Sequence, residues 1–224
     1  MDRAAAVASR VVLLRGVLSD AEILQLDALY ARIRAEEAET AAVAPSASVV
    51  KQWVAGRSGP KPTLVTAAQR AYFCKNNYSH PNLTGMRNSG HIMCFFQSEN
   101  SDRVAKHLPD VLAKVIGAMR GADHWGLLRG GSEVRVCEYH HYSTGGQVGD
   151  PKHVDSGSLL TMSILLNEPS EFEGGVFTTL EADGSVTSFT DVQRGDALVF
   201  VSEKWHSVQV CEEAAGTCVA WSYL

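Results

Sequence analysis

Two histidines and one aspartate have the types and the spacing of a metal site. His153 and Asp155 are separated by one residue in the segment PKHVDSG, and His206 follows Asp155 by 51 residues in the segment EKWHSVQV. In an extended segment, residues two apart project to the same side, so the imidazole of His153 and the carboxylate of Asp155 can reach one ion. These three side chains are therefore candidate metal ligands.

The chemistry of this ligand set narrows the choice of metal. Two imidazoles and one carboxylate on one face of an ion form a facial triad, which suits Fe(II) and leaves positions open for a co-substrate and O₂. A single H-x-D pair also arises by chance, as two loop residues that have no connection to a histidine buried elsewhere in the core. The segments around the three residues favour the metal site.

Six segments in the second half of the chain match the pattern of a known enzyme family in order and spacing. They are Tyr142-x-x-Gly145-Gly146, LTMSILLN at 160–167, FEGG at 172–175, RGDALVF at 194–200, His206-x-Val208 and Trp221. Together with the H-x-D pair, these segments resemble the Fe(II)/2-oxoglutarate-dependent dioxygenases, in particular the prolyl-hydroxylase-like branch. The resemblance covers roughly residues 132–224.

The resemblance implies a fold, a ligand set and a reaction. The fold is a double-stranded β-helix, a jelly roll of two facing sheets buttressed by helices. His153, Asp155 and His206 are the catalytic Fe(II) ligands, with 2-oxoglutarate and O₂ as co-substrates and ascorbate as a candidate reductant. Such an enzyme hydroxylates a protein residue or a small molecule, and the protein's part is to position the reacting C–H bond.

Three residues of the core are candidate contacts of 2-oxoglutarate. By resemblance, a tyrosine on the strand that precedes the H-x-D pair often contacts this co-substrate, and Tyr142 has the better spacing for that role. Thr161 and Ser163 alternate with apolar residues and therefore share one face of their strand. In the family that face lines the active site, although small residues tolerated in a tight barrel would give the same pattern.

One expected residue of the co-substrate site is missing. The family fixes the distal carboxylate of 2-oxoglutarate with an arginine or lysine about ten residues after the second histidine ligand. No Lys or Arg follows Lys204 in this chain, and the two possible alignments put Cys218 or Ala215 at the position of the cation. A buried carboxylate without a cationic partner is strongly disfavoured.

Several explanations for the missing cation remain open. Arg135, in the β-rich run at residues 132–142, is the best candidate to supply the charge, although it would also suit the surface of that strand. Alternatively, the protein uses a different co-substrate, or it is a jelly roll that binds a metal without turnover. A cupin-like metalloenzyme is a further alternative, but cupins usually present more histidines and a glutamate among their ligands.

The elements that position these residues are predicted to be helices first and strands later, a mainly β protein of the α+β class. A short strand at residues 11–17 precedes a helix that Ser19 and Glu22 cap and that runs to Thr40, and Pro109 interrupts a second helix at residues 101–119. Asp183-Gly184 predicts a hairpin turn. The β-rich runs are 132–142, 158–167, 174–182, 185–192, 195–201, 206–211 and 217–224.

The length and composition fit a single domain over residues 1–224. Its part up to residue 130 is helical and irregular, and the jelly-roll core begins at residue 131. A net charge of −5 argues against nucleic acid as a partner, and no apolar stretch approaches the ~20 residues of a membrane span. Five scattered cysteines indicate free thiols and a cytoplasmic or nuclear location. Residues 41–62 and 72–78 are a candidate lid, and Trp53, Trp125 and Trp205 line a pocket or belong to the core.

Overall fold

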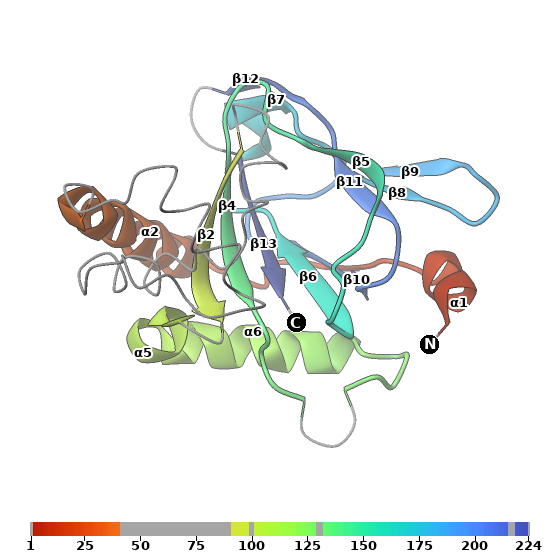
Figure 1. The fold of residues 1–224 in the computed structure, drawn as a ribbon, viewed down its shortest axis with the longest axis horizontal. Coiled ribbons are helices and arrows are strands. Elements are labelled where there is room, and N and C mark those ends of the chain that lie inside the picture. The colour runs from red at the N-terminus through yellow and green to blue at the C-terminus, as the bar shows by residue number, and fades with distance from the viewer. Residues whose placement is uncertain (1, 41–90, 99–100, 129–131, 215–217, 224) are drawn as a thin grey trace, which may run out of the picture. The chain divides into compact units, whose positions relative to one another are not determined.

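The computed structural model describes residues 2–40, 91–98, 101–128, 132–214 and 218–223 (Figure 1). The chain forms two compact units, residues 1–26 with 88–224 and residues 27–87. Of the second unit, only residues 27–40 are described, so the described strands and the candidate site all belong to the first. Trp53 and the candidate lid at 41–62 and 72–78 lie outside the described residues.

The helices precede most of the strands, as the sequence predicts. In the described residues they are α1 (Arg3–Ala8), α2 (Asp20–Thr40), α5 (Arg103–His107) and α6 (Pro109–Ala122), with a 3₁₀ turn at Pro169–Glu171. The capping box is confirmed: the Glu22 carboxylate accepts the Ser19 N–H over 2.7 Å, and the Glu22 N–H points back to the Ser19 hydroxyl over 3.4 Å. The predicted interruption at Pro109 is also confirmed, because proline is tolerated in the first turn where α6 begins.

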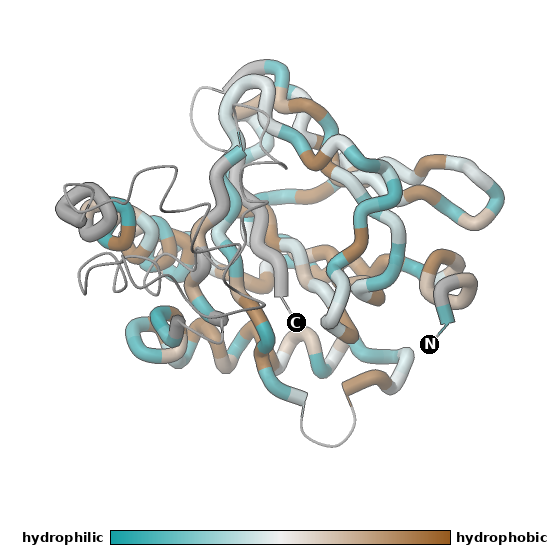
Figure 2. Tube along the Cα trace, viewed as in Figure 1, coloured by the Kyte–Doolittle hydropathy of each residue, from teal (hydrophilic) through white to brown (hydrophobic). Residues whose placement is uncertain are grey.

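Helix α6 is amphipathic, and it buries one face in the first unit. Its buried residues are Val111, Leu112, Val115, Met119 and Ala122. Figure 2 shows the corresponding alternation of hydrophobic and hydrophilic segments along this helix. Among the described residues, no helix combines the length and the apolar character that crossing a membrane requires.

The strands form antiparallel sheets. Their bounds are β1 (Val12–Leu14), β2 (His91–Ser98), β3 (Ser101–Asp102), β4 (Cys137–Tyr142), β5 (Val148–His153), β6 (Leu160–Ile164), β7 (Phe172–Gly174), β8 (Phe177–Leu180), β9 (Val186–Phe189), β10 (Ala197–Val201), β11 (His206–Val208), β12 (Cys211–Ala214) and β13 (Cys218–Tyr223). The sheet orders are β1-β10-β6, β5-β11-β8-β9, β12-β7 and β13-β4-β2-β3, and β13 also lies beside β6. The described part is therefore mostly β, consistent with the jelly-roll-like fold that the sequence resemblance implies.

The sheet of β5, β11, β8 and β9 packs against the one that contains β10. The Phe177 ring on β8 lies 5.3 Å from the Phe200 ring on β10, and Phe200 lies 4.8 Å from the imidazole of His206 on β11. Figure 1 shows the two groups of strands as separate layers. His206, one of the candidate ligands, therefore lies at the apolar interface between the two sheets.

Some strand predictions need correction. The run at 132–142 becomes a strand only from Cys137, so Arg135 precedes β4 and is exposed rather than part of a buried strand. The segment that leads into the H-x-D pair is itself a strand, β5. Its sequence does not indicate a strand, because charged residues and proline are depleted in strands. The Asp183-Gly184 turn is confirmed between β8 and β9, where Gly184 has a φ of +85°.

Candidate metal centre

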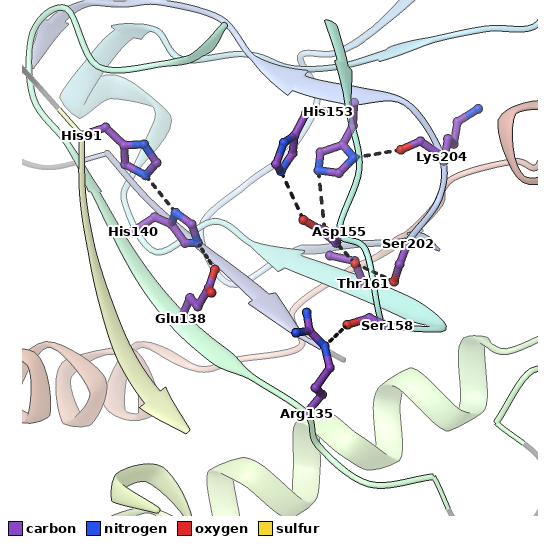
Figure 3. A network of polar contacts seen from close by, with 11 residues as sticks. His91, Arg135, Glu138, His140, His153, Asp155, Ser158, Thr161, Ser202 and Lys204 are labelled. Atoms are coloured by element: carbon purple, nitrogen blue, oxygen red, sulfur yellow. Dashed lines mark hydrogen bonds and ion pairs between the residues drawn. The ribbon is translucent and has the colours of Figure 1, made fainter. Parts of the chain in front are cut away.

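The three proposed ligands meet at the ends of two paired strands. His153 is the last residue of β5, His206 is the first residue of β11, and the two are direct partners in the antiparallel register. Asp155 follows β5 by two residues. One ligand atom from each of the three side chains lies within 4.8 Å of the others. Figure 3 shows His153 beside Asp155.

The spacing of the ligand atoms fits one metal ion. His153 Nε2 lies 3.3 Å from Asp155 Oδ1, and His206 Nε2 lies 3.6 Å from Asp155 Oδ2. Two ligands at right angles, each about 2.1 Å from one ion, are about 3 Å apart. The centroids of the two imidazole rings are 4.9 Å apart and the ring planes are at 76°, so the rings are arranged edge to face.

The His206 ring is held in one orientation and one tautomer. Its Nδ1 lies 2.9 Å from the carbonyl oxygen of Lys204, and because a carbonyl only accepts, the proton must be on Nδ1. The lone pair is then on Nε2, the nitrogen that faces Asp155. Such a hydrogen bond to the second ring nitrogen is the usual way in which proteins orient a histidine ligand. Phe177 and Phe200 pack against the ring at 5.7 and 4.8 Å.

The Asp155 carboxylate is also oriented by its neighbours. The Thr161 hydroxyl donates to Asp155 Oδ2 over 2.8 Å and lies 2.9 Å from the Ser202 hydroxyl. The backbone N–H of Asp155 donates to the carbonyl of Ser202 over 2.9 Å. These contacts connect the loop after β5 to β6 and to the end of β10.

The electrostatics favour the protonation states that a metal ion needs. Burial raises the pKa of Asp155, but the hydrogen bond from His153, the charge of His206 and the Thr161 hydroxyl outweigh it and lower that pKa to about 2. Burial lowers the pKa of His206, which favours the neutral ring. The hydrogen bond to Asp155 raises the pKa of His153. The site therefore offers an ionised carboxylate and at least one neutral imidazole, as metal coordination requires.

The residues proposed to contact 2-oxoglutarate do not gather at one point. Tyr142 is buried at the end of β4 in a cluster with Cys211, against which Val148 and Val208 pack. Arg135 precedes the other end of β4, is exposed, and donates from Nε to the Ser158 hydroxyl over 2.7 Å (Figure 3). The five steps of β4 from Cys137 to Tyr142 span about 17 Å. A five-carbon co-substrate is too short to contact both Tyr142 and Arg135.

Thr161 and Ser163 lie on β6, and the structure gives Thr161 a defined partner. Its side chain is 1% exposed and its hydroxyl contacts the Asp155 carboxylate rather than an open space. Ser163 is half-buried opposite Leu198 of β10. Trp205 is half-buried, and the ammonium group of Lys152 lies 5.0 Å from its ring.

Three polar side chains on β2 and β4, His91, His140 and Glu138, form a chain of contacts. His91 Nε2 on β2 lies 2.9 Å from His140 Nδ1 on β4, and His140 Nε2 lies 3.1 Å from the Glu138 carboxylate (Figure 3). The charge of Glu138 contributes to the raised pKa of His153, so the chain lies within electrostatic reach of the metal ligands. Because His91 is brought beside β4 only by strand pairing, no local motif could have indicated it.

Comparisons with known proteins bear on the fold. No family model and no curated relative matches the chain. A prolyl-4-hydroxylase from Pseudomonas putida matches 99% of this chain and 97% of its own at a TM-score of 0.51 and 17% identity. Two further matches have TM-scores below 0.5. A Trichoplax adhaerens prolyl hydroxylase, in complex with a hypoxia inducible factor peptide, covers 96% of this chain and 83% of its own (0.49, 13% identity). The viral collagen prolyl hydroxylase of Paramecium Bursaria Chlorella virus-1 covers 96% and 94% (0.48, 11% identity).

At this level of identity the likeness concerns the fold. It extends over nearly the whole chain, whereas the motifs that carried the resemblance cover only residues 132–224. At the level of the fold, the resemblance to the prolyl-hydroxylase-like branch of the 2-oxoglutarate-Fe(II) oxygenases is thus confirmed.

Proposed function

We propose that this protein is a non-haem Fe(II)-dependent oxygenase that uses 2-oxoglutarate and O₂ to hydroxylate a protein residue or a small molecule. The observation that carries the proposal is the meeting of His153, Asp155 and His206 within 4.8 Å. Two imidazoles and one carboxylate are the donor set of the facial triad. Iron bound there would supply the activation of O₂, while the protein orients the ligands and the substrate.

The strand order supports the double-stranded β-helix as the finer description of the fold. From β4 the chain passes to β5 and back to β6, then to β8 and β9, back to β10, on to β11 and back to β13. Strands β5, β11, β8 and β9 form one sheet, and β4, β13, β6 and β10 lie side by side as the other. We take this alternation between two sheets as the jelly roll that the resemblance implies.

We place the distal end of the co-substrate toward Tyr142. Val208, which packs against the Tyr142 cluster, lies two residues after His206 on β11, about 7 Å along the strand. A five-carbon dicarboxylate that starts at the metal ligands would cover about that distance. Arg135 is exposed beside the metal-bearing loop, where it is better placed to meet the primary substrate.

The part of the cation that the C-terminal segment lacks is then assigned to the imidazole pair His91–His140. Cys218, one of the two possible positions of the family's cation, pairs with Tyr142, and Tyr142 pairs with His91 on its other side. The rings of His91 and Tyr142 stack at 4.2 Å. Glu138 lies 3.1 Å from His140 Nε2 and so holds that ring beside His91. Arg135 is the alternative source of charge.

An anaerobic titration of the Fe(II)-loaded protein with 2-oxoglutarate tests the proposal through the visible charge-transfer band of the chelate. We expect a saturable band that is lost in Asp155→Ala. We expect His91→Phe, which keeps a ring beside Tyr142, to raise the apparent dissociation constant at least tenfold, and Arg135→Met to leave it unchanged. The opposite pattern would move the anchor to Arg135.

The missing cation also favours a second candidate function, a metal-binding jelly roll without 2-oxoglutarate turnover or with a different co-substrate. The same titration separates the two. Iron that binds tightly to the wild-type protein, and not to Asp155→Ala, without any band on addition of 2-oxoglutarate would establish this second function. If the wild-type protein does not retain iron, both candidate functions are wrong.

A further inference from the structure

Lys204 is a buried lysine that lies two residues before the candidate ligand His206. The side chain of Lys204 is 1% exposed, and its ammonium group donates to the carbonyl of Val7 over 2.7 Å and to Glu181 Oε2 over 2.9 Å. Lysine is almost never fully buried unless it is paired. Here both partners come from other elements, because Val7 belongs to α1 and Glu181 directly follows β8.

The Glu181 carboxylate, which accepts a hydrogen bond from Lys204, is itself held in place. Glu181 Oε1 accepts a hydrogen bond of 2.6 Å from the Thr179 hydroxyl, and Thr179 is the register partner of His206 in the pairing of β8 with β11. On the other side, Val7 is buried with Ala6, so α1 is packed into the first unit rather than lying free on its surface. The ammonium group therefore joins two anchored elements.

The backbone of the same turn is held as well. Residues 202–205 connect β10 to β11, the Lys204 N–H donates to the Val201 carbonyl over 2.8 Å, and the Leu180 N–H donates to the Trp205 carbonyl over 3.2 Å. The remaining polar group of Lys204 is its own carbonyl, which accepts the proton on His206 Nδ1 over 2.9 Å. One residue thus links α1, β8 and the tautomer of a metal ligand.

We propose that Lys204 is a positioning residue for His206, whose buried ammonium group ties the turn at residues 202–205 to α1 and β8 and so holds the carbonyl that fixes the His206 ring. The inference rests on the metal site of the proposed function but not on its co-substrate. It also makes α1, near the start of the chain, part of the support of the metal centre.

The experiment compares Lys204→Met with the wild-type protein by two measurements. Nitrogen-15 NMR of ring-labelled histidine in the metal-free protein reports the tautomer of His206, assigned through His206→Gln. Competition of Zn(II) with a chromophoric chelator reports metal affinity without any turnover. We expect the Nδ1–H tautomer in the wild-type protein, a mixture of tautomers in Lys204→Met, and Zn(II) affinity weaker by about 10- to 100-fold. Lys114→Met is the matched control, because Lys114 pairs with Glu22 on α2, and it should change neither measurement.

The outcomes discriminate clearly. A folded Lys204→Met protein with an unchanged His206 tautomer and unchanged Zn(II) affinity would overturn the inference, as would an Nε2–H tautomer in the wild-type protein. If Lys204→Met does not fold, Glu181→Ala takes its place, because Glu181 is partly exposed and its loss frees the ammonium group from β8. Unchanged values in that variant would also overturn the inference. A wild-type protein that binds no metal would sink the proposed function, while the tautomer measurement would still test the role of Lys204.

Discussion

The hydroxyl of Thr161 donates a hydrogen bond of 2.8 Å to Oδ2 of Asp155, the carboxylate oxygen that faces His206. Thr161 lies on β6 directly opposite Phe200 of β10, so the carboxylate is held by the core sheet and not only by its own loop. From the sequence, this hydroxyl was a candidate contact of the co-substrate, with a small residue tolerated in a tight barrel as the alternative. In the structure its partners are Asp155 and Ser202, which is the arrangement expected of a group that orients a metal ligand.

The first prediction concerns this contact. Thr161→Val keeps the shape of the side chain but removes the donor to Asp155, so metal affinity should fall about tenfold. Thr161→Ser keeps the hydroxyl and should stay within a few-fold of the wild-type protein. Chelator competition with Zn(II) measures both. Equal affinities for the wild-type protein and Thr161→Val would show that Asp155 is oriented by its backbone alone.

The second prediction concerns metal and stability. Because a metal ion binds the assembled triad and not the separated ligands, Zn(II) at about 100 times its dissociation constant should stabilise the fold by about 2.7 kcal/mol. For a chain of this size that corresponds to a rise of about 5–10 °C in the unfolding temperature. Calorimetry with and without a chelator measures the shift. Asp155→Ala should abolish it, and an equal shift in that variant would place the metal elsewhere.

The third prediction uses two glycines that share a backbone conformation. Gly195 and Gly184 have φ values of +82° and +85°, but a Cβ on Gly195 would lie 2.2 Å from the Leu18 carbonyl oxygen, whereas one on Gly184 meets nothing within 4 Å. Gly184→Ala should therefore cost about 1–2 kcal/mol for the left-handed conformation alone. Gly195→Ala should cost several kcal/mol more, because backbone must move. Urea unfolding measures both, and similar losses in the two variants would refute the close approach.

The fourth prediction concerns pH. Burial by itself raises the pKa of Glu22, but the hydrogen bonds from Lys114 and Ser19 lower it from 4.5 to about 2. Because the folded-state pKa lies below the unfolded one, this stabilisation is present above about pH 4.5 and is lost as the pH falls toward about 2. Glu22→Gln should be less stable than the wild-type protein by about 1 kcal/mol at pH 7.

Urea unfolding of both proteins between pH 7 and pH 2 measures this difference. The two stabilities should converge at the acid end of the range. A constant difference at every pH would show that the charge of Glu22 plays no part. Lys114→Met should reproduce part of the loss at pH 7, because it removes the 2.7 Å ion pair but leaves the capping hydrogen bonds of Ser19.

Much of the site was readable from the chain because its determinants are local. The one-residue spacing of His153 and Asp155 fixes their shared side, proline at 109 cannot continue a helix from the preceding turn, and Asp183-Gly184 favours the turn that joins β8 to β9. Each of these depends on a few neighbouring residues. These local features therefore do not depend on how the rest of the chain folds.

The sequence by itself thus determined the candidate ligands, the order of the elements and the absence of Lys and Arg after Lys204. Only the tertiary structure decided which polar groups accompany the ligands. It left Arg135 exposed, stacked His91 on Tyr142, and buried Lys204 between α1 and Glu181. Those neighbours come from segments far apart in the chain, and strand register and packing, which no local pattern encodes, bring them together.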